Sequence, residues 1–78
     1  MSDKMTKCEN DLAVLAKDFR RKAGKTRAQA AREMQVSQTS IFHAEESPEQ
    51  GQTKLRMRMI ETYSNFKVKG PVFLLEKK

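Results

Sequence analysis

The sequence has little of what metal sites and disulfide scaffolds require. Its 78 residues contain one cysteine, one histidine and no tryptophan. The single cysteine, Cys8, cannot form an intrachain disulfide, which is typical of chains in a reducing compartment. One cysteine and one histidine cannot complete a four-ligand zinc site. We therefore expect neither a metal site nor a disulfide framework.

Long apolar runs and glycine-rich loops are also missing. The three glycines are isolated at positions 24, 51 and 70, so no loop of the phosphate-cradling kind is present and no cofactor is implied. No apolar run approaches the roughly 18 residues that a membrane span needs. The N-terminal segment also lacks the apolar core of a signal peptide. The sequence thus predicts a cytoplasmic protein with no membrane partner.

Basic residues are present in excess, and they are clustered. The formal net charge is +6, from 16 Lys and Arg against 10 Asp and Glu. Seven basic residues and one acidic residue lie between Lys17 and Arg32. A clustered basic surface attracts phosphate, although a solvated face that keeps a small protein in solution has the same composition. Charge alone leaves both interpretations open.

Four helices are predicted, over residues 7–23, 27–34, 38–46 and 54–65. Residues 1–6 are expected to form a flexible tail, and Pro48 and Gly51 mark residues 47–52 as a loop. Gly24 is a suitable stop after the first helix, and Thr53 a suitable cap before the fourth. Helical spacing predicts the inward residues of these two helices, Leu12, Leu15, Ala16, Phe19, Leu55, Met59, Ile60 and Tyr63. A chain of 78 residues can form only a small core, so the apolar area that oligomerisation buries would add to its stability.

The second and third predicted helices carry the strongest local signals. Thr26 is a good N-cap, and Gln29 three residues later completes a capping box. Ser37 is placed to cap the third helix. The inward stripe is narrow and consists of Ala30, Ala31, Met34, Ile41 and Ala44. Small alanines allow two helices to cross closely, so the segment predicts a helix-turn-helix.

The outward positions of the third helix are Gln38, Thr39, Phe42 and His43. Polar side chains that donate and accept hydrogen bonds suit the base edges of the major groove. DNA binding is therefore the leading hypothesis from the residues alone.

Residues 19–47 resemble the helix-turn-helix of the phage repressor and Cro family, the xenobiotic-response-element (XRE) class of bacterial regulators. About two-fifths of the chain is covered, and ten positions match in register: Arg20, Gly24, Thr26, Ala30, Ala31, Met34, Val36, Ser37, Ile41 and Glu45. Arg27 stands where the family usually has Gln, and Gln35 replaces the turn glycine. Ser47 and Pro48 follow where Gly is frequent.

The resemblance implies a mainly α, lambda-repressor-like helix-turn-helix domain that binds double-stranded DNA, most often as a dimeric transcriptional repressor. Base contacts are expected from Gln38, Thr39 and His43. Phosphate contacts are expected from Arg27, Ser37, Arg20, Lys25 and Arg32. The family also implies an ion pair between Arg20 and Glu45. Glu46 occupies the position at which members of that family often have an uncharged residue that contacts phosphate.

Two outward residues have alternative interpretations. His43 is either a groove contact or an ordinary exposed histidine. Phe42 is either an exposed contact for a thymine methyl group or, as we favour from the sequence, a residue packed on the fourth helix or the C-terminal segment.

The C-terminal segment, residues 66–78, is predicted to form a strand or hairpin, with a short fifth helix as the alternative. Phe66 and Val68 alternate with lysines, which is strand spacing, whereas Pro71 would also suit the first turn of a helix. Its densest apolar run is Val72, Phe73, Leu74 and Leu75. These four residues are the expected contacts of a homodimer.

Other functions are weaker predictions. Catalysis is not expected, because His43 is the only histidine and a chain of this size offers little wall for a pocket. A protein-interaction module, such as an antitoxin-like or anti-repressor subunit with the same fold, is the main alternative. Single-stranded nucleic acid is a third option, but the five aromatic residues are spread along the chain and form no stacking platform.

Overall fold

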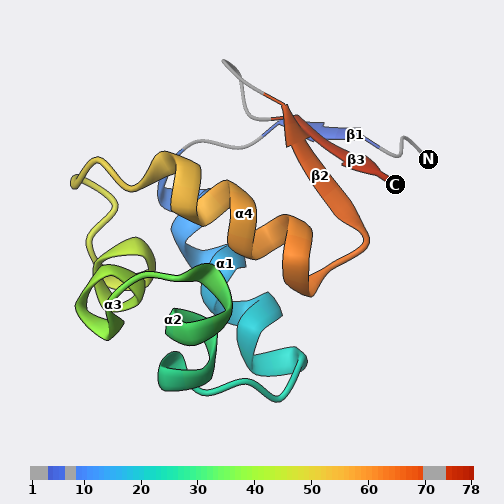
Figure 1. The fold of residues 1–78 in the computed structure, drawn as a ribbon. Coiled ribbons are helices and arrows are strands. Elements are labelled where there is room, and N and C mark those ends of the chain that lie inside the picture. The colour runs from blue at the N-terminus through green and yellow to red at the C-terminus, as the bar shows by residue number, and fades with distance from the viewer. Residues whose placement is uncertain (1–3, 7–8, 70–73) are drawn as a thin grey trace.

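The computed structural model describes residues 4–6, 9–69 and 74–78. Their elements in chain order are β1 (Lys4–Thr6), α1 (Glu9–Lys22), α2 (Arg27–Met34), α3 (Gln38–Glu46), α4 (Thr53–Tyr63), β2 (Phe66–Lys69) and β3 (Leu74–Lys77). Figure 1 shows α4 lying across α1, with α2 and α3 on one side of this pair and the strands on the other. The prediction of a mainly helical domain with four helices and a C-terminal hairpin is confirmed.

Local hydrogen bonds explain where α2 and α3 begin. Thr26 accepts a hydrogen bond from the Gln29 backbone N–H, and the Gln29 side chain accepts one from the Thr26 N–H, which completes the capping box. Ser37 caps α3 by accepting from the Ser40 N–H at 3.1 Å. The fourth helix begins one residue earlier than predicted, at Thr53, with Gln52 at its N-cap.

The turn between α2 and α3 occupies residues 35–37. Gln35 ends α2 in the left-handed conformation, with φ 60° and ψ 46°, and its N–H donates to the carbonyl oxygens of Ala31 and Arg32. A left-handed residue with a Cβ costs on the order of 1 kcal/mol. Gln35 therefore adopts a conformation that a glycine would adopt without this cost, and it adds a modest local strain to the turn.

The core joins all four helices to the sheet. Its fully buried apolar side chains include Leu12 and Ala16 of α1, Ile41 of α3 and Met59 and Ile60 of α4. Phe19 and Phe66 pack against this core, with their ring centroids 6.1 Å apart. The buried apolar side chains are mostly aliphatic, and the sequence contains no tryptophan.

The strands form a three-stranded antiparallel sheet in the order β1-β3-β2. Met5 pairs with Leu75, and Val68 pairs with Leu75 from the other side. Residues 4–6, predicted to belong to a flexible tail, are instead a strand at the edge of this sheet. The tail prediction was wrong there because a strand needs a partner, and the partner lies at the other end of the chain.

The sheet also changes the expected dimer contact. Leu75 is 0% exposed inside the protein, so it is a core residue and not a surface contact. Val72, Phe73 and the side chain of Leu74 lie outside the described part of the chain. Because β3 is the central strand, β1 and β2 occupy both of its edges.

The outer edge of β2 is closed by side chains of the same protein. The Phe66 N–H donates to Ser64 Oγ at 3.1 Å, and the Val68 N–H donates to Glu61 Oε2 at 2.9 Å. A second chain pairing at this edge would have to displace both bonds. Within the described residues, the N–H groups of Phe66 and Val68 are therefore not free for a second chain.

Among the described residues, no helix combines the length and the apolar character needed to cross a membrane.

Candidate nucleic-acid interface

The helices α2 and α3 meet through small buried side chains. Ala30 and Ala44 are 0% exposed and Ala31 is 4% exposed, with Ile41 fully buried beside them. Alanine brings two helix backbones close together, because it adds one methyl group between them. This close crossing directs the opposite side of α3 towards solvent.

The outward side of α3 carries the three side chains Gln38, Thr39 and Phe42, all exposed. Together with Arg27 of α2 they line a shallow groove of about 260 Å³. His43 is half-buried beside them. The structure thus brings together the residues predicted to contact bases, with Phe42 added to them.

Phe42 departs from the interpretation favoured from the sequence. Its side chain is 45% exposed and does not belong to the core. The Arg27 guanidinium carbon lies 5.1 Å from the centre of its ring, and the His43 ring meets it edge-on at 5.9 Å. The ring stays outside because α3 already buries Ile41 and Ala44 on its inward side, and residue 42 lies on the other side of the helix.

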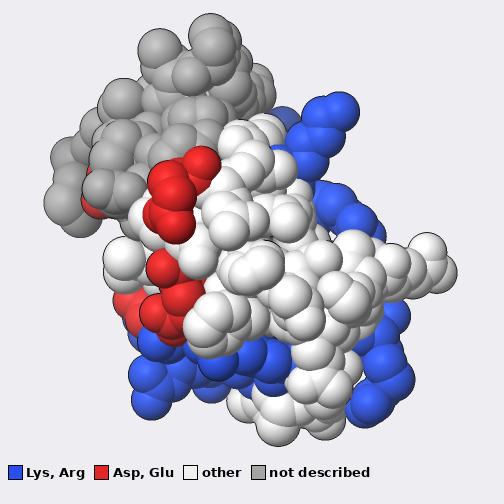
Figure 2. Space-filling model, turned by 90° about the vertical axis from the view of Figure 1, so that its left-hand side faces the viewer, with Lys and Arg blue, Asp and Glu red and all other residues white. Residues whose placement is uncertain are grey.

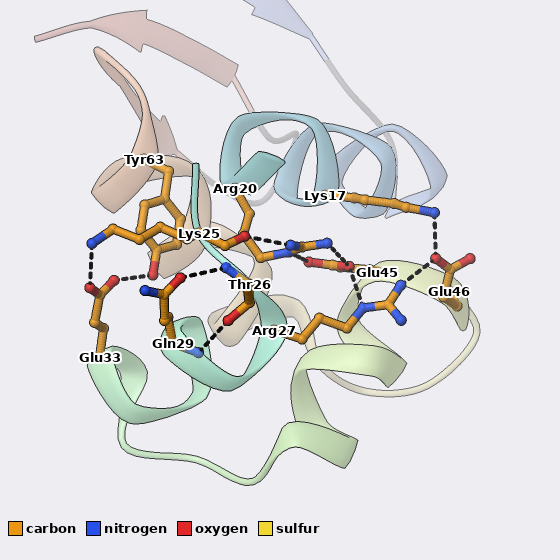
Figure 3. Close-up of polar contacts among 10 residues, drawn as sticks. All are labelled: Lys17, Arg20, Lys25, Thr26, Arg27, Gln29, Glu33, Glu45, Glu46 and Tyr63. Atoms are coloured by element: carbon orange, nitrogen blue, oxygen red, sulfur yellow. Dashed lines mark hydrogen bonds and ion pairs between the residues drawn. The ribbon is translucent and has the colours of Figure 1, made fainter. Parts of the chain in front are cut away.

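Arg20 and Glu45 form the ion pair that the resemblance implies (Figure 3). Arg20 Nε donates to Glu45 Oε2 at 2.5 Å, and Nη2 donates to Oε1 at 3.1 Å. Arg20 Nη1 also donates to the carbonyl oxygen of Lys25 at 2.7 Å. The two side chains are 9% and 0% exposed, which corrects the prediction that Arg20 contacts a phosphate. The pair ties the C-terminal end of α1 to that of α3.

Arg27, another expected phosphate contact, is also engaged by carboxylates. Its Nε lies 3.0 Å from Glu45 Oε1 and its Nη2 2.8 Å from Glu46 Oε2. Lys17 reaches the same Glu46 oxygen at 2.6 Å (Figure 3). The Lys17 ammonium, followed by the Arg27 charge, holds the pKa of Glu46 below its ordinary value. Arg27 therefore braces the end of α3.

The other expected phosphate contacts lie nearer the surface. Lys25 pairs with Glu33 at 2.8 Å, and Tyr63 donates a hydrogen bond to the same carboxylate. These two contacts lower the pKa of Glu33, Lys25 having the larger effect. Burial and the Glu33 carboxylate raise the pKa of Tyr63. Arg32 is exposed on α2, and the exposed Ser37 hydroxyl caps α3.

The charge on this side of the molecule is unevenly placed. Figure 2 shows the side on which α3 and the chain after it lie. Uncharged side chains fill its centre, Lys and Arg side chains border it below and on the right, and acidic side chains gather on its left. An uncharged surface with basic borders on two of its sides is suited to bases flanked by phosphates.

Arg56 is a structural residue that the sequence analysis missed. It is 0% exposed, and its guanidinium donates to three carbonyl oxygens, those of Ala44 at 2.8 Å, Ser47 at 2.8 Å and Gln50 at 3.1 Å. It therefore fixes the end of α3 and the following loop. A signal was available, because residues 56, 59, 60 and 63 share one helix face.

No family model, curated protein or solved structure matches the chain. Within the described residues, no three His, Cys, Asp or Glu side chains come together as a metal site. The geometry around α3 and the resemblance of residues 19–47 to the phage repressor and Cro helix-turn-helix are the features that point to a function.

Proposed function

We propose that the protein is a sequence-specific regulator that binds double-stranded DNA and acts as a transcriptional repressor in the cytoplasm. The observation that carries this proposal is the outward side of α3. It presents the uncharged side chains of Gln38 and Thr39 to solvent. On the side of the molecule where α3 lies, uncharged side chains have basic borders below and on the right and an acidic border on the left (Figure 2). A helix of this kind fits the major groove, where each base pair offers a distinct pattern of donors and acceptors.

The proposed roles follow from exposure and chemistry. Gln38 has an amide that suits the bidentate edge of adenine. Thr39 and His43 supply a hydroxyl and an imidazole one turn apart. Arg32 provides positive charge for a phosphate, which sets the register of the protein on the duplex. Lys25 does the same in competition with the Glu33 carboxylate, which lies 2.8 Å from its ammonium.

Ser37 and Arg27 have smaller proposed roles in phosphate binding. The Ser37 hydroxyl accepts a backbone N–H at the start of α3 and lies 3.0 Å from Ser40 Oγ. It remains exposed, so it can donate to a phosphate when the Ser40 hydroxyl is the donor in this pair. Arg27 is held by Glu45 and Glu46, and a phosphate would have to compete with these carboxylates. Its main contribution is to the position of α3.

We further propose that the protein binds as a homodimer on a two-fold symmetric site. One helix in one groove makes only a small contact, and half-sites about one helical turn apart allow two copies to bind together. The subunit contact involves surfaces other than Leu75 and the outer edge of β2, since the single chain already uses both.

Selection of bound sequences from a random pool of duplex DNA tests the proposal directly. We expect a conserved motif of two inverted half-sites, with affinity for the motif falling steeply as salt concentration rises. The same pool selected with Gln38→Ala serves as a control, and it should yield a motif relaxed at one position. Recovery of no common motif would overturn the proposal.

The main alternative is a protein-interaction module. Exposed apolar side chains favour it, because Phe42 is 45% and Val14 57% exposed. The salt dependence discriminates between the two functions. Binding to DNA weakens steeply with salt, whereas an apolar contact with a protein does not.

A further inference from the structure

Phe42 is the most unusual residue on the outward side of α3. A large aromatic side chain that is 45% exposed stands among polar neighbours at the groove lined by Arg27, Gln38 and Thr39. Burial of this ring would be favourable, yet no core residue covers it. Its ring is nevertheless held in place by Arg27 at 5.1 Å and His43 at 5.9 Å.

We propose that Phe42 is a specificity-determining residue that selects thymine by contacting its 5-methyl group. This inference rests on the proposed binding of double-stranded DNA and names one base that the site reads. Of the four bases, only thymine carries an apolar group in the major groove. A methyl group gains by leaving water for an apolar surface, and the ring offers that surface without a hydrogen-bonding group.

The position of Phe42 on α3 supports this role. Residues 38 and 42 are four apart, and residues 39 and 42 three apart, so the three side chains lie along one stripe of the helix. A helix that places Gln38 and Thr39 against base edges also places the Phe42 ring against a neighbouring base pair. The thymine should therefore lie within one or two base pairs of the position that Gln38 reads.

The contacts around the ring give Arg27 a positioning role. Its guanidinium is fixed by Glu45 and Glu46 at 3.0 and 2.8 Å and lies over the ring of Phe42. The ring therefore loses little side-chain freedom when it meets a base. If Arg27 served only to bind phosphate, its guanidinium would need neither the two carboxylates that hold it nor a position over the Phe42 ring.

Replacement of thymine by uracil tests the inference, since uracil lacks only the 5-methyl group. Each thymine of the selected duplex is replaced in turn, and dissociation constants are measured for the wild-type protein and for Phe42→Ala. At one thymine in each half-site we expect wild-type binding to weaken about fourfold, which corresponds to roughly 0.8 kcal/mol for one methyl group. Phe42→Ala should show no such loss at that thymine.

Two further variants make the comparison specific. Phe42→Leu keeps an apolar side chain and should retain part of the preference for thymine over uracil. Val14→Ala removes an apolar side chain that is 57% exposed on α1, and it should leave the preference unchanged. Thermal unfolding checks that Phe42→Ala folds, as expected for a ring outside the core.

The outcomes separate the inference from the proposed function. Selection without any motif overturns both. A motif whose thymines all tolerate uracil, or whose uracil penalty persists in Phe42→Ala, overturns the thymine contact and leaves DNA binding in place. If Phe42→Ala binds the selected duplex as tightly as the wild type does, the thymine contact is likewise excluded, and the ring is available to a protein partner.

Discussion

The two sides of α3 differ in how fully their side chains are committed to the fold. On the inward side, Ile41 and Ala44 are buried and the carboxylate of Glu45 accepts from two arginines. On the outward side, Gln38 and Thr39 are exposed beside a groove. The same nine-residue helix therefore anchors itself on one side and offers polar groups to solvent on the other.

This difference shows how a small domain holds a recognition surface rigid. Charged side chains fix the C-terminal end of α3, since Arg20, Arg27 and Arg56 all donate to groups at that end or just beyond it. At its N-terminal end, Ser37 supplies a cap. With both ends fixed, little of the binding free energy is needed to order the helix.

The largest effect is expected from Glu45→Ala, which breaks the inward side. The variant leaves the buried Arg20 guanidinium without its carboxylate, and loss of one partner of a buried pair costs about 3–5 kcal/mol. Urea denaturation measures the loss. The matched control is Glu46→Ala, whose side chain is 35% exposed and which should lose much less stability. Equal midpoints for Glu45→Ala and the wild type would contradict the importance of this buried pair.

Arg56→Met should have the next largest effect. Methionine fills much of the same space, but it removes the donors to the carbonyl oxygens of Ala44, Ser47 and Gln50. Loss of these charged hydrogen bonds should cost on the order of 2–3 kcal/mol, measured by urea denaturation. Arg58→Met, at an exposed position of the same helix, is the control. If both variants lose the same stability, burial of Arg56 does not matter to the fold.

Gln38→Ala tests the outward side and should leave stability nearly unchanged. We expect a loss of about 1–3 kcal/mol on the selected duplex and a relaxed preference at one base position. Arg32→Ala should instead weaken all sequences similarly and lower the salt slope by about one phosphate contact. Binding titrations on selected and random duplexes at several salt concentrations measure both effects.

Arg27→Ala sharpens the same comparison. Because two carboxylates already hold the Arg27 guanidinium, Arg27→Ala should lower the salt slope less than Arg32→Ala does.

The assignment of Gln38 to base reading fails if Gln38→Ala weakens binding to selected and random DNA equally.

The smallest expected effect is the loss, at low pH, of the stability that the charge of Glu46 contributes. Its pKa in the folded protein lies below the ordinary value of 4.5, through Lys17 first and then Arg27. A lowered pKa contributes stability above the unfolded pKa, and this contribution disappears as the pH falls through the folded value. Glu46→Gln should therefore be less stable than the wild type at pH 7, and the difference should shrink as the pH falls through the folded pKa of Glu46. A difference in stability that stays constant from pH 7 into the acid range would show that the charge of Glu46 is not its cause.

Local signals in the sequence determined the helices and the orientation of α3. The capping box of Thr26 and Gln29 involves groups three residues apart, so it is recognisable without knowledge of the rest of the chain. The spacing of Ala30, Ala31, Ile41 and Ala44 likewise fixed the inward side and exposed Gln38 and Thr39. These features depend on neighbours within one or two turns.

Only the tertiary structure decided the features that join distant segments. Lys4–Thr6 became a strand because β3, at the other end of the chain, offers its open edge. Arg27, which the sequence predicts only as a phosphate contact, also braces α3, because its guanidinium lies 2.8 Å from Glu46 when α2 and α3 cross. Leu75 became core because its strand is central in the sheet. Backbone hydrogen bonds near in sequence set each helix, whereas the partner of a charged or apolar side chain depends on which distant segment packs beside it.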